Sequence, residues 1–127
     1  MAKTYYLENA LLNEVLRATA YTPPATVYIA LFTATPGPAG GGTEVAGNAY
    51  ARQSASFSAP TNGSLTNSAD VTFPQATGAW GTISYFGIFD DPAAGNLLYY
   101  GSLTASKTIA SGDQLKFAAG GITVTES

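Results

Sequence analysis

The sequence contains no cysteine and no histidine among its 127 residues. Without cysteine there is no disulfide framework, no thiolate nucleophile and no thiolate metal site. Without histidine, the commonest general base and the commonest metal ligand are both missing. Serine and threonine are abundant, but a hydroxyl nucleophile needs a base, and the Gly-x-Ser-x-Gly pattern does not occur. These absences predict a protein that is not an enzyme and that has no catalytic residue, cofactor or metal.

Charged residues are scarce as well, at 10% of the chain, against about 25% in ordinary soluble domains. The net charge is −3, and the five lysines and arginines stand apart at positions 3, 17, 52, 107 and 116. Because no basic cluster could neutralise phosphates, nucleic-acid binding is not expected. The apolar runs are shorter than the ~20 residues of a membrane-spanning helix, and no secretory signal is evident. A surface with so few charges favours permanent burial against neighbouring molecules.

What the chain does have is apolar residues, at 46%, enough for one globular domain over residues 1–127. Residues 4–19 show helical periodicity, with Thr4 placed to cap the start and the pair Pro23 and Pro24 ending the pattern. The apolar stripe of this helix has to pack on the domain's own sheet or on an adjoining subunit. It consists of Leu7, Leu11 and Val15, widened by Leu12 and Leu16.

The remaining residues, 26–126, have the pattern of β-structure. Residues 26–33 are apolar on both faces, which predicts a central strand. In the run from 79 to 89, strict alternation places Ile83 and Tyr85 on one face, opposite Phe86. About eight short strands separated by turn residues predict a mainly β fold, a jelly-roll-like β-sandwich with one N-terminal α-helix.

Asp90 and Asp91 form the one pair of adjacent carboxylates, within the turn from 90 to 96. Neighbouring residues on a strand point to opposite faces, which argues against a shared catalytic role. A calcium site would need further oxygen ligands at Asp-x-Asp-x-Asp-Gly spacing, and that spacing is missing. We therefore expect an Asx-type turn, with Pro92 fixing φ and Gly95 or Asn96 in the left-handed region.

Aromatic residues are plentiful, with eight tyrosines, six phenylalanines and one tryptophan. Core packing accounts for most of them, while exposed rings can form a subunit interface or stack on a sugar. Tyr99 and Tyr100 are adjacent, so at least one should face away from the core. Arg52 can pair with Glu44, pair with Asp70, or cross an interface. The interface candidates are Leu7, Leu11, Val15, Tyr50, Arg52, Tyr99 and Tyr100.

The order of these elements resembles a group of small tailed-bacteriophage virion proteins of the tail-fibre or minor structural type. The resemblance spans residues 6–125, and its most distinctive pieces are GGGTEVAGNAYAR, WGTISYFGIFD and NLLYYGSLT. It implies a virion structural protein made in the host bacterial cytoplasm, as a tail-fibre, tail-adaptor or capsid-decoration component. It implies no catalytic residues.

Composition and resemblance together predict a symmetric homo-oligomer that docks on other virion proteins, with a trimer favoured by analogy with fibre proteins. Partner contacts would involve the helical stripe and the loops 34–47 and 90–96. Neither nucleic acid nor a membrane is expected as a partner. One other function stays open, a host-surface carbohydrate-binding module, which makes a host glycan a candidate partner. A hydrolase is disfavoured because histidine and cysteine are missing. It would require a carboxylate pair brought together from distant strands, such as Glu44 and Asp70.

Overall fold

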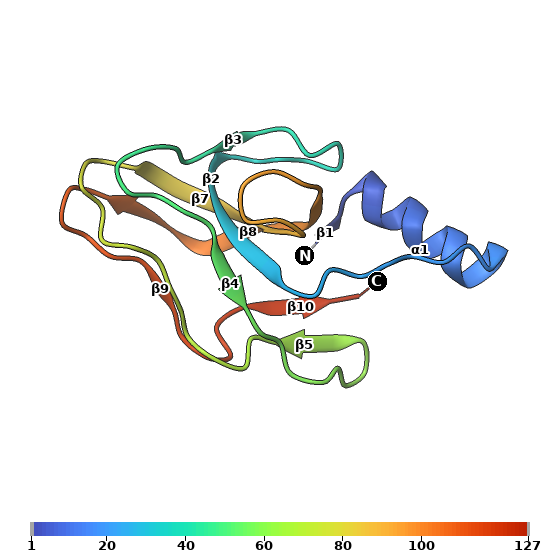
Figure 1. The fold of residues 1–127 in the computed structure, drawn as a ribbon. Helices are drawn as coiled ribbons and strands as arrows, with labels where there is room; N and C mark the ends of the chain where they lie inside the picture. Colours follow the sequence, from blue (N-terminus) through green and yellow to red (C-terminus); the bar gives the residue numbers. More distant parts are fainter. Residues whose placement is uncertain (1, 127) are drawn as a thin grey trace.

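The computed structural model describes residues 2–126, which form one helix and ten short strands (Figure 1). The helix, α1, spans Tyr5–Arg17. The strands are β1 (Ala2–Lys3), β2 (Val27–Ala34), β3 (Thr43–Glu44), β4 (Gln53–Ala55), β5 (Ser64–Thr66), β6 (Val71–Thr72), β7 (Gly81–Phe89), β8 (Leu97–Ile109), β9 (Lys116–Phe117) and β10 (Thr123–Thr125). The predicted mainly β fold with one N-terminal helix is confirmed.

The largest sheet is antiparallel and follows the order β1-β8-β7-β2-β3, with β4 also pairing with β2. Strands β2 and β7 lie at its centre, as expected for residues 26–33, whose side chains are apolar on both faces. Two small antiparallel ladders, β10-β5 and β6-β9, complete the β-structure. Figure 1 shows β5, β9 and β10 along one side of the large sheet.

Two apolar clusters lie on opposite faces of the large sheet, and β2 contributes to both in strict alternation. Ile29 and Leu31 belong to the main core, which also contains Phe73 and Ile122 from the segments that cover the sheet. Ala30 and Phe32 belong to a smaller cluster with Phe89 and Leu97. Because successive side chains of a strand point to opposite faces, the uninterrupted apolar run of β2 is needed to fill both clusters.

The strand arrangement departs from the predicted one. Ten strands are present in the described residues, against about eight expected, and the jelly-roll topology is not confirmed. Several strands have only two or three residues, too short to produce a sequence alternation that stands out from the surrounding turns.

The predicted face of Ile83 is wrong. Ile83 pairs with Lys107, whereas Tyr85 pairs with Ser102, so the β7-β8 register shifts between them. Ile83 joins Phe86 in the main core, while Tyr85 packs on the smaller cluster. A register shift of this kind interrupts the alternation that the prediction assumed to be continuous.

Helix α1 starts at Thr4, as predicted, because the Thr4 side chain accepts a hydrogen bond from the Leu7 N–H (3.4 Å). Thr4 is buried, and its Oγ1 also donates to the carbonyl of Leu97 (2.6 Å), so the cap fastens the helix to β8. The helix ends at Arg17, earlier than the predicted end at residue 19 and well before Pro23 and Pro24, because Ala18 takes a left-handed φ of 52°. Beyond this attachment, α1 extends away from the sheets at one end of the molecule (Figure 1).

Candidate functional site

The two adjacent aspartates build the turn that joins β7 to β8. Asp91 Oδ2 accepts hydrogen bonds from the Ala93 N–H (2.9 Å) and the Ala94 N–H (2.7 Å). Asp90 Oδ1 accepts from the Asn96 N–H (2.7 Å), and Gly95 takes the left-handed φ of 73°. The hydrogen bond from the Ala94 N–H, followed in size by the one from the Ala93 N–H, lowers the pKa of Asp91. Both carboxylates therefore act as acceptors for the backbone of their own turn.

Arg52 fastens this turn to the rest of the domain. Its guanidinium makes a two-point contact with Glu44, Nε to Oε2 and Nη2 to Oε1, each at 2.9 Å. Its Nη1 donates to the carbonyls of Asp91 (3.0 Å) and Ala94 (2.8 Å). The guanidinium carbon also lies 3.5 Å from the centre of the Phe89 ring. Of the partners considered for Arg52, the structure selects Glu44.

Tyr50 links the same network to the main core. Its ring stacks on Phe73 and meets Trp80 edge to face. Its hydroxyl donates to Glu44 Oε2 (2.7 Å) and accepts from the Leu31 N–H (3.0 Å). Burial and the hydrogen bond to Glu44 raise the pKa of Tyr50 well above its ordinary value. Tyr50 and Arg52 thus contact residues of their own chain.

The carboxylates Glu44 and Asp70 have separate partners. Glu44 is held by Arg52 and Tyr50, whereas Asp70 lies 3.7 Å from the Lys116 ammonium and accepts from the Ala119 N–H (2.9 Å). The structure therefore gives no support to a paired-carboxylate hydrolase at these two residues.

The two adjacent tyrosines of β8 have different surroundings. The Tyr99 hydroxyl donates to Glu126 Oε2 (2.7 Å), and Lys3 contacts the same carboxylate, so Tyr99 links Glu126 and, through it, Lys3 to β8. Burial opposes ionisation of Glu126, but the hydrogen bonds from Lys3 and Tyr99 outweigh it and lower its pKa. Tyr100 packs against the smaller apolar cluster on the other side of the sheet.

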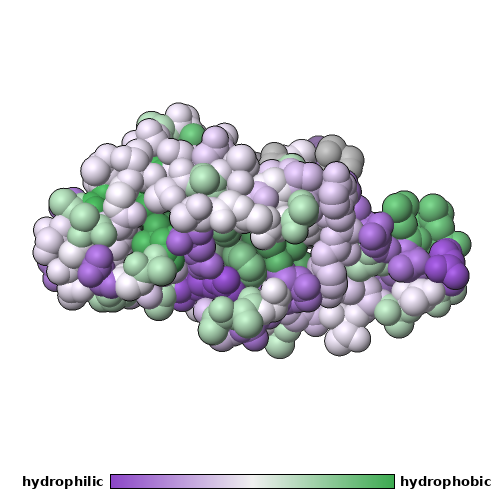
Figure 2. Space-filling model, turned by 90° about the horizontal axis from the view of Figure 1, so that it is seen from above, coloured by the Kyte–Doolittle hydropathy of each residue, from purple (hydrophilic) through white to green (hydrophobic). Residues whose placement is uncertain are grey.

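The apolar stripe of α1 is covered at one end and open at the other. Leu7 is buried against the domain, and Leu11 is partly buried. Further along the helix the exposed fractions rise to 55% for Leu12 and 75% for both Val15 and Leu16. Figure 2 shows hydrophobic surface at the end of the molecule where α1 extends. We call Leu11, Leu12, Val15 and Leu16 the α1 face. The sequence places Leu12 and Leu16 in the stripe, but the interface candidates that it names on the helix are Leu7, Leu11 and Val15.

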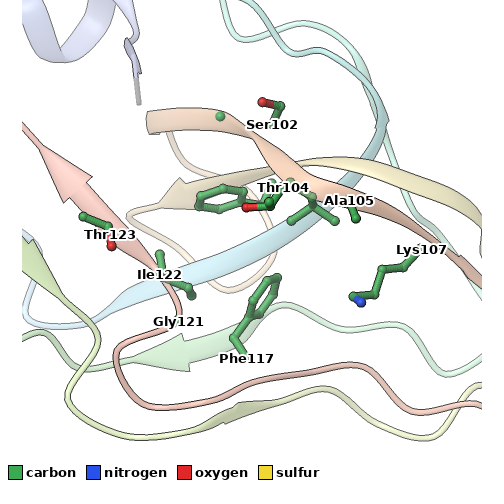
Figure 3. A pocket seen from close by; sticks show the side chains of 11 residues that line it. Ser102, Thr104, Ala105, Lys107, Phe117, Gly121, Ile122 and Thr123 are labelled. Carbon is green, nitrogen blue, oxygen red and sulfur yellow. The ribbon is translucent and has the colours of Figure 1, made fainter.

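A second surface feature lies between β8 and the segment that leads into β10. It is a hollow of about 470 Å³, lined on one side by residues 101–105 and Lys107 and on the other by Phe117 and residues 121–123, with Phe86 contributing as well (Figure 3). Sequence reasoning missed this hollow, because it is formed where the β7-β8 register shifts and where two distant segments approach each other.

Fold and surfaces together define the class of protein. It is a mainly β protein with a helix that presents apolar residues to its surroundings, and its few charged groups largely bind one another or the backbone. Within residues 2–126 no helix is both long and apolar enough to cross a membrane. The same residues contain no cluster of three or more acidic or other metal-binding side chains.

The chain belongs to a family of phage fibre proteins. The family model described as podophage GP4 fiber I protein gp80 matches residues 2–125, nearly the whole chain. A search of curated proteins gives no match. Membership in this family makes the chain a phage tail fibre protein, a structural component of the virion, and implies a non-enzymatic role. It confirms the resemblance found in the sequence and gives no support to capsid decoration.

Proposed function

We propose that this protein is a tail-fibre subunit that self-assembles through the α1 face and docks, once assembled, on other virion proteins. The observation that carries the proposal is the exposure of Leu12, Val15 and Leu16 along one side of a helix that extends from the domain. Exposed apolar side chains that are contiguous on one element are typical of protein interfaces.

The length of α1 supports an assembled state. Isolated helices shorter than about 12–15 residues are marginal in water, and most helical stability in proteins comes from packing of the apolar face. Helix α1 has 13 residues, all of them within the described part of the chain. Leu7 is the one residue among these 13 that is buried. Packing of the α1 face against another surface would therefore stabilise the helix itself.

A second copy of the chain is the partner we favour for the α1 face. Where equivalent helices lie at the rotation axis of a closed ring of identical subunits, the same residues recur at every interface. The chain carries only 10% charged residues, so repulsion between copies is weak. A trimer is the proposed state, by analogy with other fibre proteins.

Light scattering coupled to size-exclusion chromatography tests self-assembly. We expect the wild-type protein to elute as a trimer and the double variant Leu12→Gln, Leu16→Gln to elute as a monomer. Glutamine keeps a high helix propensity, so the change removes apolar surface without unwinding α1. The matched control is Glu14→Gln, on another face of the same helix, which should leave the assembly unchanged. A wild-type protein that stays monomeric at high concentration contradicts the proposal.

Incorporation into particles tests docking separately. Phage that lack the protein are supplied with each variant, and the virions are purified and probed for the subunit. We expect the double variant to be depleted from virions and the Glu14→Gln variant to be retained. Full incorporation of a double variant that is monomeric in solution would show that the α1 face is not needed for docking.

A further inference from the structure

The exposed side of α1 borders a second hollow, of about 530 Å³. Most of its lining is the α1 face, and the other described residues that line it are Asn9 and two charged residues, Lys3 and Glu8. When the α1 face packs on a second copy of the chain, as proposed above, this surface loses its water. Taking a charged group out of water is costly unless an opposite charge or a dipole compensates it. The two charged residues therefore affect how readily the surface can be buried.

The negative charge of Glu8 is compensated by the helix to which it belongs. Glu8 lies in the first turn of α1, where the N–H groups of the helix end and the helix dipole stabilise a negative charge. Because this compensation comes from the backbone of α1, it is kept when another molecule covers the α1 face. The positive charge of Lys3, in β1, needs compensation from elsewhere.

The charge of Lys3 is compensated by Glu126, a residue far away in the sequence. The Lys3 ammonium contacts the Glu126 carboxylate, and the Lys3 side chain is only 18% exposed, against 55% for Lys116 in the pair with Asp70. Glu126 follows β10 and also accepts a hydrogen bond from the Tyr99 hydroxyl of β8 (2.7 Å). Figure 1 shows β10 running toward the end of the molecule where β1 and the start of α1 lie. Residues outside the helix thus hold the carboxylate that faces Lys3.

We propose that Glu126 is the counter-ion of the assembly surface, and that its contact with Lys3 allows the α1 face to be buried against a second copy of the chain. This inference rests on the self-assembly proposed above and adds an electrostatic requirement to it. With Glu126 ionised, assembly covers a lysine whose charge is already balanced. When that carboxylate is neutralised, assembly has to take the Lys3 ammonium out of water without the negative charge of Glu126, which weakens the interface.

Sedimentation velocity over a dilution series of the full-length protein tests this role of Glu126. Glu126→Gln removes the charge and keeps the size of the side chain, and its amide oxygen can still accept from Tyr99. We expect this variant to raise the concentration at which the oligomer dissociates at least about tenfold. The double variant Lys3→Met, Glu126→Gln also removes the ammonium and keeps an unbranched side chain at position 3. It should assemble at least as tightly as the wild type, because an apolar replacement of a buried ion pair is often neutral or stabilising.

Asp70→Asn is the matched control, because it removes one carboxylate charge beside a lysine, Lys116, at the β6-β9 ladder. It should leave the assembly unchanged. A Glu126→Gln variant that assembles as tightly as the wild type overturns the counter-ion role and leaves self-assembly intact. The role is also overturned if Asp70→Asn weakens assembly equally, or if the double variant assembles as weakly as Glu126→Gln. A wild-type protein that is monomeric at every concentration refutes self-assembly itself, and this inference with it.

Discussion

At the scale of single residues, Arg52 connects several segments of the fold, and the sequence did not predict most of these contacts. Its side chain is 8% exposed and contacts Glu44, two loop carbonyls and the Phe89 ring. Lysine keeps the charge but not the planar, multi-donor geometry, so Arg52→Lys should lower the free energy of unfolding by about 2 kcal/mol. Chemical denaturation measures this loss.

Lys116→Ala is the control for Arg52→Lys. Lys116 and Asp70 are both about half exposed and lie 3.7 Å apart, so their pair should contribute less than about 1 kcal/mol. If Arg52→Lys and Lys116→Ala lower the free energy of unfolding equally, the Arg52 contacts contribute no more to stability than an exposed ion pair does.

Gly95 provides a second test at the residue scale. It has a φ of 73°, and a Cβ at this position would lie 2.2 Å from Asp90 Oδ1, the acceptor for the Asn96 N–H. Gly95→Ala should therefore cost about 1–2 kcal/mol for the left-handed backbone and about 1 kcal/mol more for the displaced hydrogen bond. Gly112 has a φ of 90° with no atom within 4 Å of the added Cβ, so Gly112→Ala reports the backbone cost alone. If Gly95→Ala and Gly112→Ala lower the stability to thermal unfolding equally, the added Cβ at position 95 does not displace the hydrogen bond between Asp90 and Asn96.

The pH dependence of stability tests the role of Asp91. Its pKa is lowered in the folded state by hydrogen bonds from Ala94 and Ala93. A lowered pKa stabilises the fold above the unfolded value, and the effect is lost as the pH falls through the folded value. Stability of the wild type should therefore decline below about pH 4. Asp91→Asn cannot titrate and should decline less steeply in denaturation series between pH 7 and pH 3. Parallel curves for the two proteins would contradict this assignment.

At the scale of elements, α1 is the part of the molecule whose stability should depend most on assembly. Its start is fixed by Thr4, but its last turns have an exposed apolar side. We expect amides of the last two turns to exchange with solvent faster than those of β2 and β7 in dilute protein, and to become protected as concentration rises. Hydrogen exchange measured over a dilution series checks this. Helix protection that equals that of β2 at every dilution would contradict it.

Much of the element structure could be predicted because it depends on local chemistry. The Thr4 cap, the central strand β2 and the Asx turn at Asp91 each follow from short patterns. The face of Ile83 could not be predicted, since it depends on a register shift with a strand some twenty residues away in the sequence. The exposure of Val15 could not be predicted either, because the sequence pattern shows which side of a helix is apolar but not what covers that side.

At the scale of the whole molecule, the protein is a β-domain in which most charged side chains bind one another or the backbone, with two outward features, the α1 face and the hollow at Lys107. The family match makes the chain a phage tail fibre protein. Three features suit a structural subunit that binds its neighbours better than they suit an enzyme. They are the low content of charged residues, the short exposed helix and the hydrogen-bonded turn from 90 to 96.

The position of the protein in a reconstruction of the intact virion would show whether the α1 face holds the fibre subunits together. We expect copies of the chain at the tail, related by a rotation axis, with Leu12, Val15 and Leu16 of each copy buried against a neighbouring copy. A reconstruction in which the α1 face of every copy points into solvent would contradict it.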